Sequence, residues 1–531
     1  MREGLNVTRV PVIDIFAGPG GLSEGFASLC PSSPRQTCFR IALSVEKDAW
    51  AHRTLELRAF FRQFPAGEAP EEYYRYLRGE IERQQPFHAF PEQAAAASEQ
   101  AWMAELGSKD TSHEVVDARI RRTVGGTAWW VLVGGPPCQA YSIIGRSRLR
   151  GGDPEAFEKD PRHFLYKEYL RILAEHKPPV FLMENVPGIL SSTVNGNKIF
   201  DQILDDLKNP RKALMAGAPR QVSPADESPY RVYTLVKEQG SGLLPEESEA
   251  RDYIIKSERY GIPQTRHRLI LLGVRADLAG KPHTLSREDK APTMWQTISD
   301  LPAIRSALSR EDDSPEAWRQ AVHSVREAQW LRDSCLTHKL RRRIAEVISA
   351  LKADLPVGGE FVPGNGRPEF SGLWYHDAKL RGYCNHAGRK HMRSDLARYL
   401  FAACFADVEG RSPKLGDFPQ ALLPRHNSVD DALSGGHFND RFRVQVRDRA
   451  ATTIVSHISK DGHYYIHPDP LQCRTLTVRE AARLQTFPDN YFFEGPRTQQ
   501  YVQVGNAVPP LLAKQIAAVV YELLRDRGAF A

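Results

Sequence analysis

The sequence predicts an α/β protein built on a mostly parallel sheet, together with a separate, smaller second domain. Apolar, strand-like runs alternate with helix-like stretches over residues 1–275, and this alternation favours a parallel sheet with helices on its faces. The alternation stops near residue 276 and returns near 441. We therefore expect a first domain over 1–275, a second domain over 276–440, and a return to the first domain over 441–531.

Length and composition are those of a globular chain with more than one folding unit. The 531 residues, 41% of them hydrophobic, can fill a large core. The seven cysteines are too few and too scattered for a disulfide framework, which indicates reduced thiols. Neither a leader-like segment nor a run of 18 apolar residues occurs, so a cytosolic protein without a membrane partner is expected. The net charge of +6 only weakly favours a nucleic-acid partner.

The first strand-like run, Val12–Phe16, leads through the glycine-rich turn AGPGG into a helix-like stretch. Gly18 and Gly20 remove side chains where the backbone turns, so a ligand can reach main-chain amides near a helix N-terminus. The same glycines can serve turn geometry alone. The next strand-like run ends at Glu46, where a carboxylate can accept hydrogen bonds from ribose hydroxyls or simply stay solvated. Residues 57–115 are rich in helix formers and charge, which predicts a helical insertion.

A cysteine stands directly after the next buried strand. The run WWVLV is followed by GGPPCQAYS, which places Cys138 just beyond a strand end, at the edge where open α/β sheets bind ligands. Pro136 and Pro137 fix φ, which suits a side chain held in one direction. Glu184 occupies the equivalent edge after the strand VFLM. A loop cysteine alone is more often inert, but here a nucleophile and an acid are predicted to share one pocket.

The predicted second domain carries two basic clusters, HKLRRR at 338–343 and GRKHMR at 388–393. Such clusters are either solvated faces or a source of phosphate contacts. The cysteines and histidines nearby match no regular zinc spacing, so no metal site is predicted. These residues are Cys335, His338, Cys384, His386 and His391.

Beyond residue 441, strand-helix character returns near ATTIVSHIS. The stretch LTVREAARLQTFPDNYFF predicts a capped helix followed by a turn. QVGNAVPP then leads into LLAKQIAAVVYELLRDR, whose apolar residues recur at the spacing of an amphipathic helix.

Six segments carry a resemblance to a known family: DIFAGPGG, GGPPCQ, MENV, QTRHR, REAARLQTFP and QVGNAVPP. In these blocks and in their order, the chain resembles cytosine-C5 DNA methyltransferases of the bacterial modification or defence type. The resemblance covers most of the chain outside about 276–440. It implies a Rossmann-like fold that depends on S-adenosyl-L-methionine, with a target-recognition domain at 276–440 and double-stranded DNA as partner.

The resemblance also implies a role for each matching residue. Cys138 would be the nucleophile that adds to cytosine C6, and Glu184 would hold N3. Arg266 and Arg268 would be cations near the pyrimidine O2 and the local phosphates. Asn185 would mainly fix loop geometry, as would Gln139, which lies in the segment expected to face DNA. The residues implied for the cofactor site are Phe16, Gly18, Gly20, Glu46, Pro136 and Asn506. Those implied for DNA binding by the loop after the nucleophile are Gln139, Arg146, Arg148 and Arg150.

One position of the family pattern has no assignment. The acidic block that usually contacts the adenine is not evident here, and Asp110 and Asp117 are both candidates.

Together these expectations define a DNA (cytosine-5-)-methyltransferase that flips its target base and works through a covalent Cys138–C6 intermediate. A tRNA cytosine-C5 methyltransferase is the first alternative, disfavoured by the large second region. A non-catalytic DNA-binding subunit is the second, disfavoured because Cys138, Glu184, Arg266 and Arg268 are all present. We expect a monomer in the bacterial cytosol, associated with the nucleoid, with a cognate restriction or other defence protein as a candidate partner.

Overall fold

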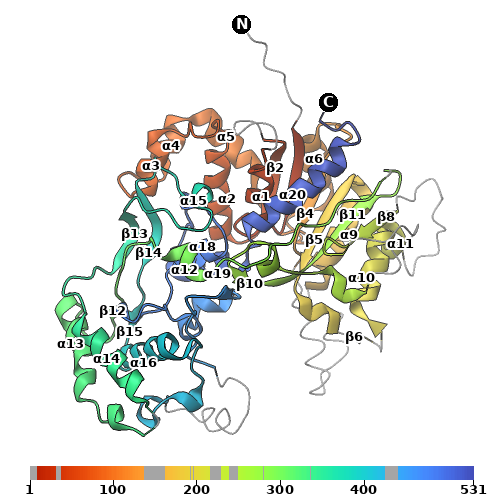
Figure 1. Cartoon of the computed structure of the whole chain (residues 1–531). Coiled ribbons are helices and arrows are strands. Elements are labelled where there is room, and N and C mark those ends of the chain that lie inside the picture. The colour runs from red at the N-terminus through yellow and green to blue at the C-terminus, as the bar shows by residue number, and fades with distance from the viewer. Residues whose placement is uncertain are drawn as a thin grey trace.

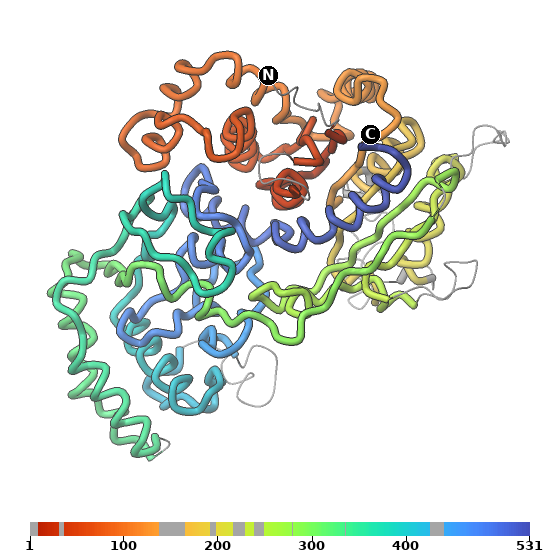
Figure 2. The backbone as a smooth tube through the Cα atoms, turned by 45° about the horizontal axis from the view of Figure 1, so that its top comes forward, coloured from red at the N-terminus to blue at the C-terminus, as the bar shows by residue number. Residues whose placement is uncertain are grey.

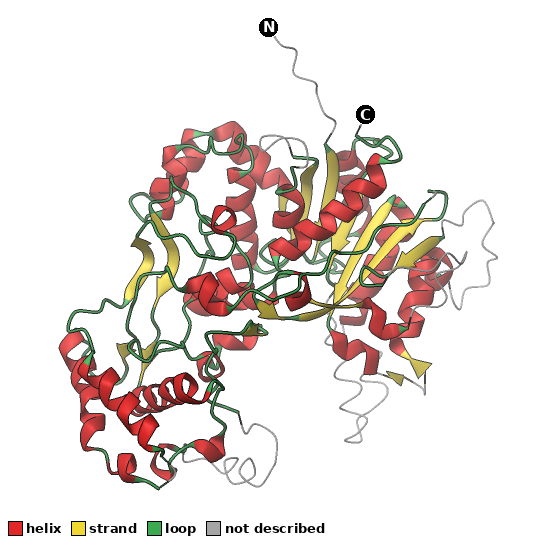
Figure 3. Cartoon of the chain, viewed as in Figure 1, coloured by secondary structure: helices red, strands yellow, loops and turns green. Residues whose placement is uncertain are grey.

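The computed structural model describes residues 9–30, 37–136, 162–191, 193–194, 197–215, 229–237, 249–278, 280–334, 336–424 and 440–530. The described residues form two parts (Figure 1). The sheet region comprises the described residues of 9–278 together with the C-terminal helix α20 (Pro510–Arg525). The second region comprises residues 294–476, and the linking segment 477–506 lies between the two. Strands gather in the sheet region, whereas helices dominate the far end of the second region (Figure 3).

The main sheet is mixed, with a parallel majority. Among the described residues it has eight strands in the order β3-β2-β1-β4-β5-β11-β8, and β9 also pairs with β11. The first five in this order run parallel, whereas β11 runs antiparallel to β5, β8 and β9. This agrees with the predicted α/β fold and mostly parallel sheet. The strands are β1 (Val10–Ile15), β2 (Phe39–Glu46), β3 (Ala101–Met103), β4 (Val131–Gly134), β5 (Val180–Asn185), β8 (Tyr230–Tyr233), β9 (Ile254–Lys256) and β11 (His267–Arg275).

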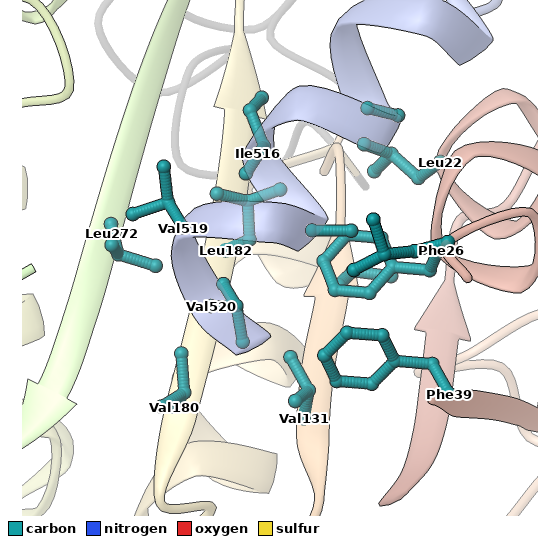
Figure 4. Packing of buried hydrophobic residues seen from close by; sticks show 14 of the residues in the cluster. Leu22, Phe26, Phe39, Val131, Val180, Leu182, Leu272, Ile516, Val519 and Val520 are labelled. Carbon is teal, nitrogen blue, oxygen red and sulfur yellow. The ribbon is translucent and has the colours of Figure 1, made fainter. Parts of the chain in front are cut away.

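Helices cover both faces of this sheet because successive strand side chains point to opposite sides. Val180 and Leu182 of β5 lie in the core under α1 and α20, whereas Phe181 and Met183 lie in the core on the other face. Figure 4 shows Ile516 and Val520 of α20 above the strands. The helices next to the sheet are α1 (Gly21–Ala27) and α20 on one face, with α6 (His113–Val124), α9 (Arg162–His176) and α10 (Ile199–Lys208) on the other. Short elements nearby are β6 (Thr193–Val194), β7 (Asn197–Lys198) and α11 (Pro210–Leu214).

Helices fill much of the interval 57–115, as expected, but the interval is not purely helical. It also holds β3, which pairs in parallel with β2 at the edge of the main sheet. Three residues are too short a run to show an alternating pattern in sequence. The helices here are α2 (Ala49–Phe61), α3 (Glu71–Leu77), α4 (Gln84–Ala89) and α5 (Pro91–Gln100).

The second region has its own core, and this core extends past the predicted boundary at 440. Phe442, Val444, Ile466 and Cys473 are buried in the same cluster as helices α14 and α16. The packing unit therefore ends near residue 476 rather than 440. The elements between residues 294 and 476 are α12 (Met294–Ile298), β12 (Ala307–Leu308), α13 (Pro315–His323), α14 (His338–Ser349), β13 (Gly358–Pro363), α15 (Gly372–Tyr375), β14 (Gly382–Ala387), β15 (Lys390–His391), α16 (Arg393–Glu409) and β16 (Ala451–Thr452). Of these, α12 packs with the linking segment, and Cys384 of β14 packs with α2 and α3.

The segment near ATTIVSHIS does not rejoin the main sheet. Its two-residue strand β16 pairs only with β10 (Gln264–Thr265). Because β10 lies just before β11, this pairing brings the C-terminal part of the second region close to the catalytic edge of the sheet. Figure 2 shows the blue C-terminal segments running between the N-terminal helices and the second region.

The linking segment contains the predicted capped helix. Helix α18 (Val478–Leu484) begins after Thr477, whose hydroxyl accepts the Glu480 amide while the Glu480 carboxylate accepts the Thr477 amide. Helix α19 (Arg497–Asn506) follows the turn. One helical stretch in the described residues, Arg497–Arg525, is long and apolar enough to span a membrane, but 67% of its apolar window is buried inside the protein. Core helices of globular proteins have the same property.

Candidate active site

The glycine-rich turn follows β1 at the C-terminal edge of the sheet. We call residues 16–20 the cofactor loop. Phe16, Gly18 and Gly20 all have positive φ values, of 56°, 56° and 91°. A Cβ at Gly18 would meet no atom within 4 Å, so the loop is open to an approaching ligand there. At Gly20 a Cβ would lie 2.7 Å from Leu55 Cδ2, so this glycine is required by packing as well as by φ.

Glu46, at the end of β2, binds the cofactor loop. Its carboxylate accepts the amide of Gly18 at 2.7 Å and those of Lys47 and Asp48 at 2.9 and 2.8 Å. Burial raises the pKa of this carboxyl, and the backbone amides partly offset that shift. The structure thus places Glu46 beside Gly18, as the sequence predicts for two residues of one site.

The neighbouring strand tip supplies an acidic residue that the sequence interpretation missed. Glu105 follows β3 and pairs with Lys47 at 3.0 Å, next to Glu46. Neither Asp110 nor Asp117, the two candidates from the sequence, lies at this strand tip. Asp117 is occupied between α6 and α9, where it binds Arg171 and His176, and Asp110 is exposed in the loop before α6. The pairing of β3 with β2 was the missing signal, because it shows which acidic residue follows a strand.

The segment that leads to the predicted nucleophile leaves β4 beside Glu184. Gly134 ends the strand and Gly135 follows it, and a Cβ at Gly135 would lie only 2.8 Å from Glu184 Oε2. Glycine therefore lets this turn pass directly over the glutamate, and Pro136, buried, comes next. The predicted residues Cys138, Gln139, Arg146, Arg148 and Arg150 lie outside the described residues.

Glu184 forms an ion pair with Arg268. The Arg268 Nε lies 2.8 Å from the Glu184 Oε1, and the two side chains are only 11% and 15% exposed. They meet because β11 pairs antiparallel with β5, with Ile270 opposite Glu184, and residues two apart on a strand point to the same face. Burial lowers the pKa of Arg268, and the Glu184 carboxylate partly offsets that shift.

Arg266, predicted to act beside Arg268, has a different position. Its side chain is 1% exposed, and it donates to the carbonyls of Ile454 at 2.6 Å and Gly505 at 3.1 Å. Burial, followed by the charge of Arg268, lowers its pKa well below the usual value. The structure therefore places the Arg266 guanidinium in the interior, where it is hydrogen-bonded to backbone carbonyls. Arg266 ties the catalytic strand to the second region and to α19, a role that spacing in QTRHR could not reveal.

Asn185 and Asn506 are the two asparagines that the family resemblance places in or near the site. Asn185 is buried and its Oδ1 accepts the amide of Val186 at 2.7 Å, which agrees with a role in loop geometry. Asn506 is exposed at the end of α19. The backbone two residues later packs against the first turn of α1, where a Cβ at Gly21 would lie 2.1 Å from Val508 O. Asn506 is thus carried to the cofactor-loop side of the molecule.

Known proteins are similar to this chain in sequence and in the fold described above. A family model of C-5 cytosine-specific DNA methylases matches residues 110–210 and 251–522. The chain belongs to the C-5 cytosine-specific DNA methylase family. The predicted family is therefore confirmed: the chain is a DNA (cytosine-5-)-methyltransferase, which uses a methyl donor and takes DNA as substrate.

Relatives resemble the chain over most of its length. The Type II methyltransferase M.Bpa9945I of Bacillus paralicheniformis is 33% identical over 533 residues, covering 97% of this chain and 99% of the relative. The DNA (cytosine-5-)-methyltransferase M.ApeKI of Aeropyrum pernix is 28% identical and covers 74% of this chain and 81% of the relative. A solved structure of an E. coli prophage-encoded protein, named as a DNA modification methyltransferase, has a TM-score of 0.50 at 18% identity, covering 97% of this chain and 99% of that one. That last likeness shows the fold alone.

The basic clusters of this methyltransferase are largely engaged within the protein. On α14, Arg343 pairs with Asp407 at 2.8 Å and Arg342 with Glu346 at 3.3 Å. Near β15, Arg389 lies 4.0 Å from the centre of the Tyr501 ring. Asp407, distant in sequence, and Glu346, one helical turn away, thus reduce the charge that the first cluster offers to phosphates.

No group of three His, Cys, Asp or Glu residues in the described ranges could hold a metal ion. Two of the histidines considered as ligands, His386 and His391, have structural partners. His386 Nδ1 lies 3.0 Å from Thr477 Oγ1, and His391 Nε2 lies 3.2 Å from Thr475 Oγ1. Cys384 is buried in a hydrophobic cluster, and Cys335 is outside the described residues.

Proposed function

We propose that the protein transfers the methyl group of S-adenosyl-L-methionine to C5 of a cytosine flipped out of a specific duplex sequence, through a covalent bond between Cys138 and C6. The observation that carries the proposal is the Glu184–Arg268 ion pair at the C-terminal edge of the sheet. It lies directly under the Gly135 turn that leads to Cys138 in the sequence. The cofactor loop opens at the same edge, after the neighbouring strand β1.

The residues at the cofactor loop fit a nucleoside bearing a sulfonium. Glu46 Oε1 accepts two backbone amides, whereas Oε2 accepts only that of Gly18 and keeps a lone pair for a ribose hydroxyl. The open side of Gly18 leaves room for the ligand. Glu105, at the next strand tip, is the acidic residue we assign to the adenine end. When bound, S-adenosyl-L-methionine supplies an electrophilic methyl group.

The chain's own residues make cytosine C5 reactive. C5 is a weak nucleophile, so the Cys138 thiolate first adds to C6, and the new S–C6 bond pushes electron density towards C5. Glu184 holds N3 and stabilises the charge that this addition creates, while Arg268 fixes the direction of the Glu184 carboxyl. After C5 has gained the methyl group, loss of the C5 proton expels the cysteine and restores the ring double bond.

The target base must leave the helix first, because C6 is shielded in a stacked duplex. Unstacking and unpairing cost a few kcal/mol, on the order of what phosphate contacts can return. Arg146, Arg148 and Arg150 are the residues we assign to these contacts, on the resemblance of their loop to the family pattern.

The biological setting we propose is DNA modification in a Type II restriction-modification or other defence system. The names of relatives such as M.Bpa9945I support this setting. Within it, the protein acts as a monomer in the bacterial cytosol, on nucleoid DNA. A cognate restriction enzyme shares its target sequence.

The first test is methyl transfer with a labelled donor to duplex DNA and, separately, to tRNA. We expect labelled DNA only, and bisulfite sequencing of DNA from expressing cells will identify the target sequence. DNA with 5-fluorocytosine at that target should trap the protein covalently, because fluorine cannot leave C5 as a cation. The adduct should be absent in Cys138→Ser. Transfer to tRNA alone, or an adduct on another cysteine, would overturn the assignment.

A second test concerns the second region, to which we assign sequence recognition. Exchanging this region for that of a relative with another target should move methylation to the other sequence. Because its core extends through Cys473, the exchange should end after residue 476. Continued methylation of the original sequence would place recognition elsewhere, with the helices α3–α5 as the next candidate.

A further inference from the structure

The cofactor loop is held by a tyrosine from a distant part of the chain. The hydroxyl of Tyr491, in the linking segment, donates to the backbone carbonyl of Pro19. The same hydroxyl lies 3.0 Å from where a Cβ at Gly20 would stand. Tyr491 is 0% exposed, so water cannot replace this contact. Pro19 lies in the loop between Gly18 and Gly20.

The backbone of Tyr491 is in turn held by an arginine that also binds the second region. Arg479, on α18, donates to the Tyr491 carbonyl at 2.7 Å and to the Cys384 carbonyl of β14 at 2.8 Å. Arg479 is fully buried. The Arg479 side chain therefore links β14 to Tyr491, which is hydrogen-bonded to the cofactor loop.

Two neighbours of Tyr491 repeat this connection. The Phe493 amide donates to Asn385 Oδ1 of β14 at 3.0 Å, and Asn385 Nδ2 donates to the Phe493 carbonyl at 3.2 Å. Asn490 Nδ2 donates to Asp377, between α15 and β14, at 2.6 Å. The segment 490–493 is thus fixed to the second region at several points, and its orientation follows that of β14.

A second contact reaches the helix after the loop. Arg58 lies over the Tyr491 ring, with its Cζ 4.9 Å from the ring centre, and donates to Asn490 Oδ1 at 3.0 Å. It also forms a buried ion pair with Glu24 of α1 at 2.5 Å. The loop and the start of α1 are therefore held from the same side.

We propose that Tyr491 is a positioning residue, through which the second region sets the geometry of the cofactor loop. The inference rests on the proposed function, because it takes S-adenosyl-L-methionine as the ligand of that loop. Its consequence is a coupling of the two ligands: DNA that orders the second region should raise affinity for the cofactor, and the cofactor should raise affinity for DNA by the same factor.

The test is Tyr491→Phe, which removes the hydroxyl and keeps the ring. A matched control is Tyr230→Phe, because the buried Tyr230 hydroxyl also donates to a proline carbonyl, that of Pro178 at 2.9 Å, at the opposite edge of the sheet. We expect Tyr491→Phe to raise the Kd and KM for S-adenosyl-L-methionine about threefold to tenfold, the usual range for one buried neutral hydrogen bond. At saturating cofactor, kcat should stay near that of the wild type.

Calorimetry with and without target DNA measures the coupling. DNA should tighten cofactor binding in the wild type and in Tyr230→Phe, and should do so less in Tyr491→Phe. Equal losses of Tm in the two variants, with unchanged cofactor Kd in Tyr491→Phe, would show a purely structural role and overturn the inference. Wild-type protein that does not bind S-adenosyl-L-methionine at all would instead reject the proposed function, and the inference with it.

A measurement on the wild-type protein tests the same coupling and does not depend on the folding of any variant. Hydrogen exchange of the amides of residues 16–18, 20 and 21 should slow when target DNA is added without cofactor. Unchanged exchange there, with slowed exchange in β14, would show that the second region binds DNA without acting on the loop.

Discussion

The ion pair at the C-terminal edge of the sheet is less completely buried than the arginine pairs of the linking segment and the second region. In the linking segment, Arg483 is 0% exposed and pairs with Asp300 at 2.5 Å and Asp489 at 2.8 Å. In the second region, Arg474 binds Glu480 at 2.6 Å with both side chains 1% exposed. At the catalytic edge of the sheet, by contrast, Glu184 and Arg268 keep 15% and 11% of their surface exposed.

The difference indicates two purposes for charged groups. A buried arginine with carboxylates on several sides has no donor to spare for a substrate, and it holds segments distant in sequence in one arrangement. A pair at a strand tip retains exposed surface and can exchange partners when a ligand arrives. We therefore expect the catalytic residues at the strand tips. The buried arginine networks are expected to hold the segments of the fold in one arrangement.

The largest effect is expected when the nucleophile is removed and the folded structure is left unchanged. Cys138→Ser should lower methyl transfer by at least about a thousandfold, as the loss of a covalent nucleophile does in other enzymes. Affinity for target DNA and the Tm should stay near the wild-type values. Filter-bound transfer assays and gel shifts measure the two properties, and a serine variant with more than a tenth of wild-type activity would contradict the assigned nucleophile.

The converse experiment breaks a buried ion pair that stabilises the fold and leaves the residues at the strand tips unchanged. Arg483→Gln leaves Asp300 and Asp489 without their cation in the interior, and breaking a buried pair in this way costs about 3 to 5 kcal/mol. Urea unfolding should show this loss, and activity should fall with the folded fraction. Arg342→Gln is the control, because Arg342 and Glu346 are 68% and 53% exposed and such pairs contribute little. A stability loss for Arg483→Gln no larger than the control's would mean that the network does not hold the regions together.

A smaller effect is expected at the cofactor edge. Glu46→Ala removes hydrogen bonds to a charged acceptor, each worth about 1.5 to 3 kcal/mol, so the affinity for S-adenosyl-L-methionine should fall roughly tenfold or more. Calorimetry at matched folded fraction measures it. Glu71→Gln, exposed on α3, is the control, and equal affinities in the two variants would remove Glu46 from the site.

The smallest effect concerns Asp14, a buried carboxyl on β1 of the sheet region. This carboxyl is 0% exposed, accepts a hydrogen bond from Ser23 at 2.6 Å, and has one oxygen without a partner. Burial raises its pKa from 3.8 to about 7. Because the folded-state pKa is raised, its contribution to stability is complete below pH 3.8 and is lost as pH rises through about 7.

Between pH 6 and 8 the free energy of unfolding should therefore fall by about 1 kcal/mol through this group. Asp14→Asn, which cannot titrate, should flatten that part of the profile, whereas Asp110→Asn at an exposed site should not. Parallel pH profiles for the wild type and Asp14→Asn would show that Asp14 is ionised in the folded protein across this range.

Much of the sheet region could be predicted because its signals are local. The strand after Arg9, the glycine turn and Glu46 follow one another within a short stretch, and alternation of apolar residues indicates which strands are buried on both faces. The capped start of α18 was also predictable, since Thr477 and Glu480 are three residues apart. The second region offered no such pattern, because its strands are short and its core is assembled from separated segments.

The sequence by itself determined the family, the α/β fold class and the identity of the residues at each strand end, because these depend on residue types at short spacing. Only the tertiary structure decided which of those residues meet. Arg268 rather than Arg266 reaches Glu184 because the register of β11 on β5 places Arg268 two residues from Ile270, opposite Glu184, whereas Arg266 precedes β11. Glu105 and Tyr491 enter the cofactor edge for the same reason: strand pairing and domain packing bring together side chains that no sequence spacing relates.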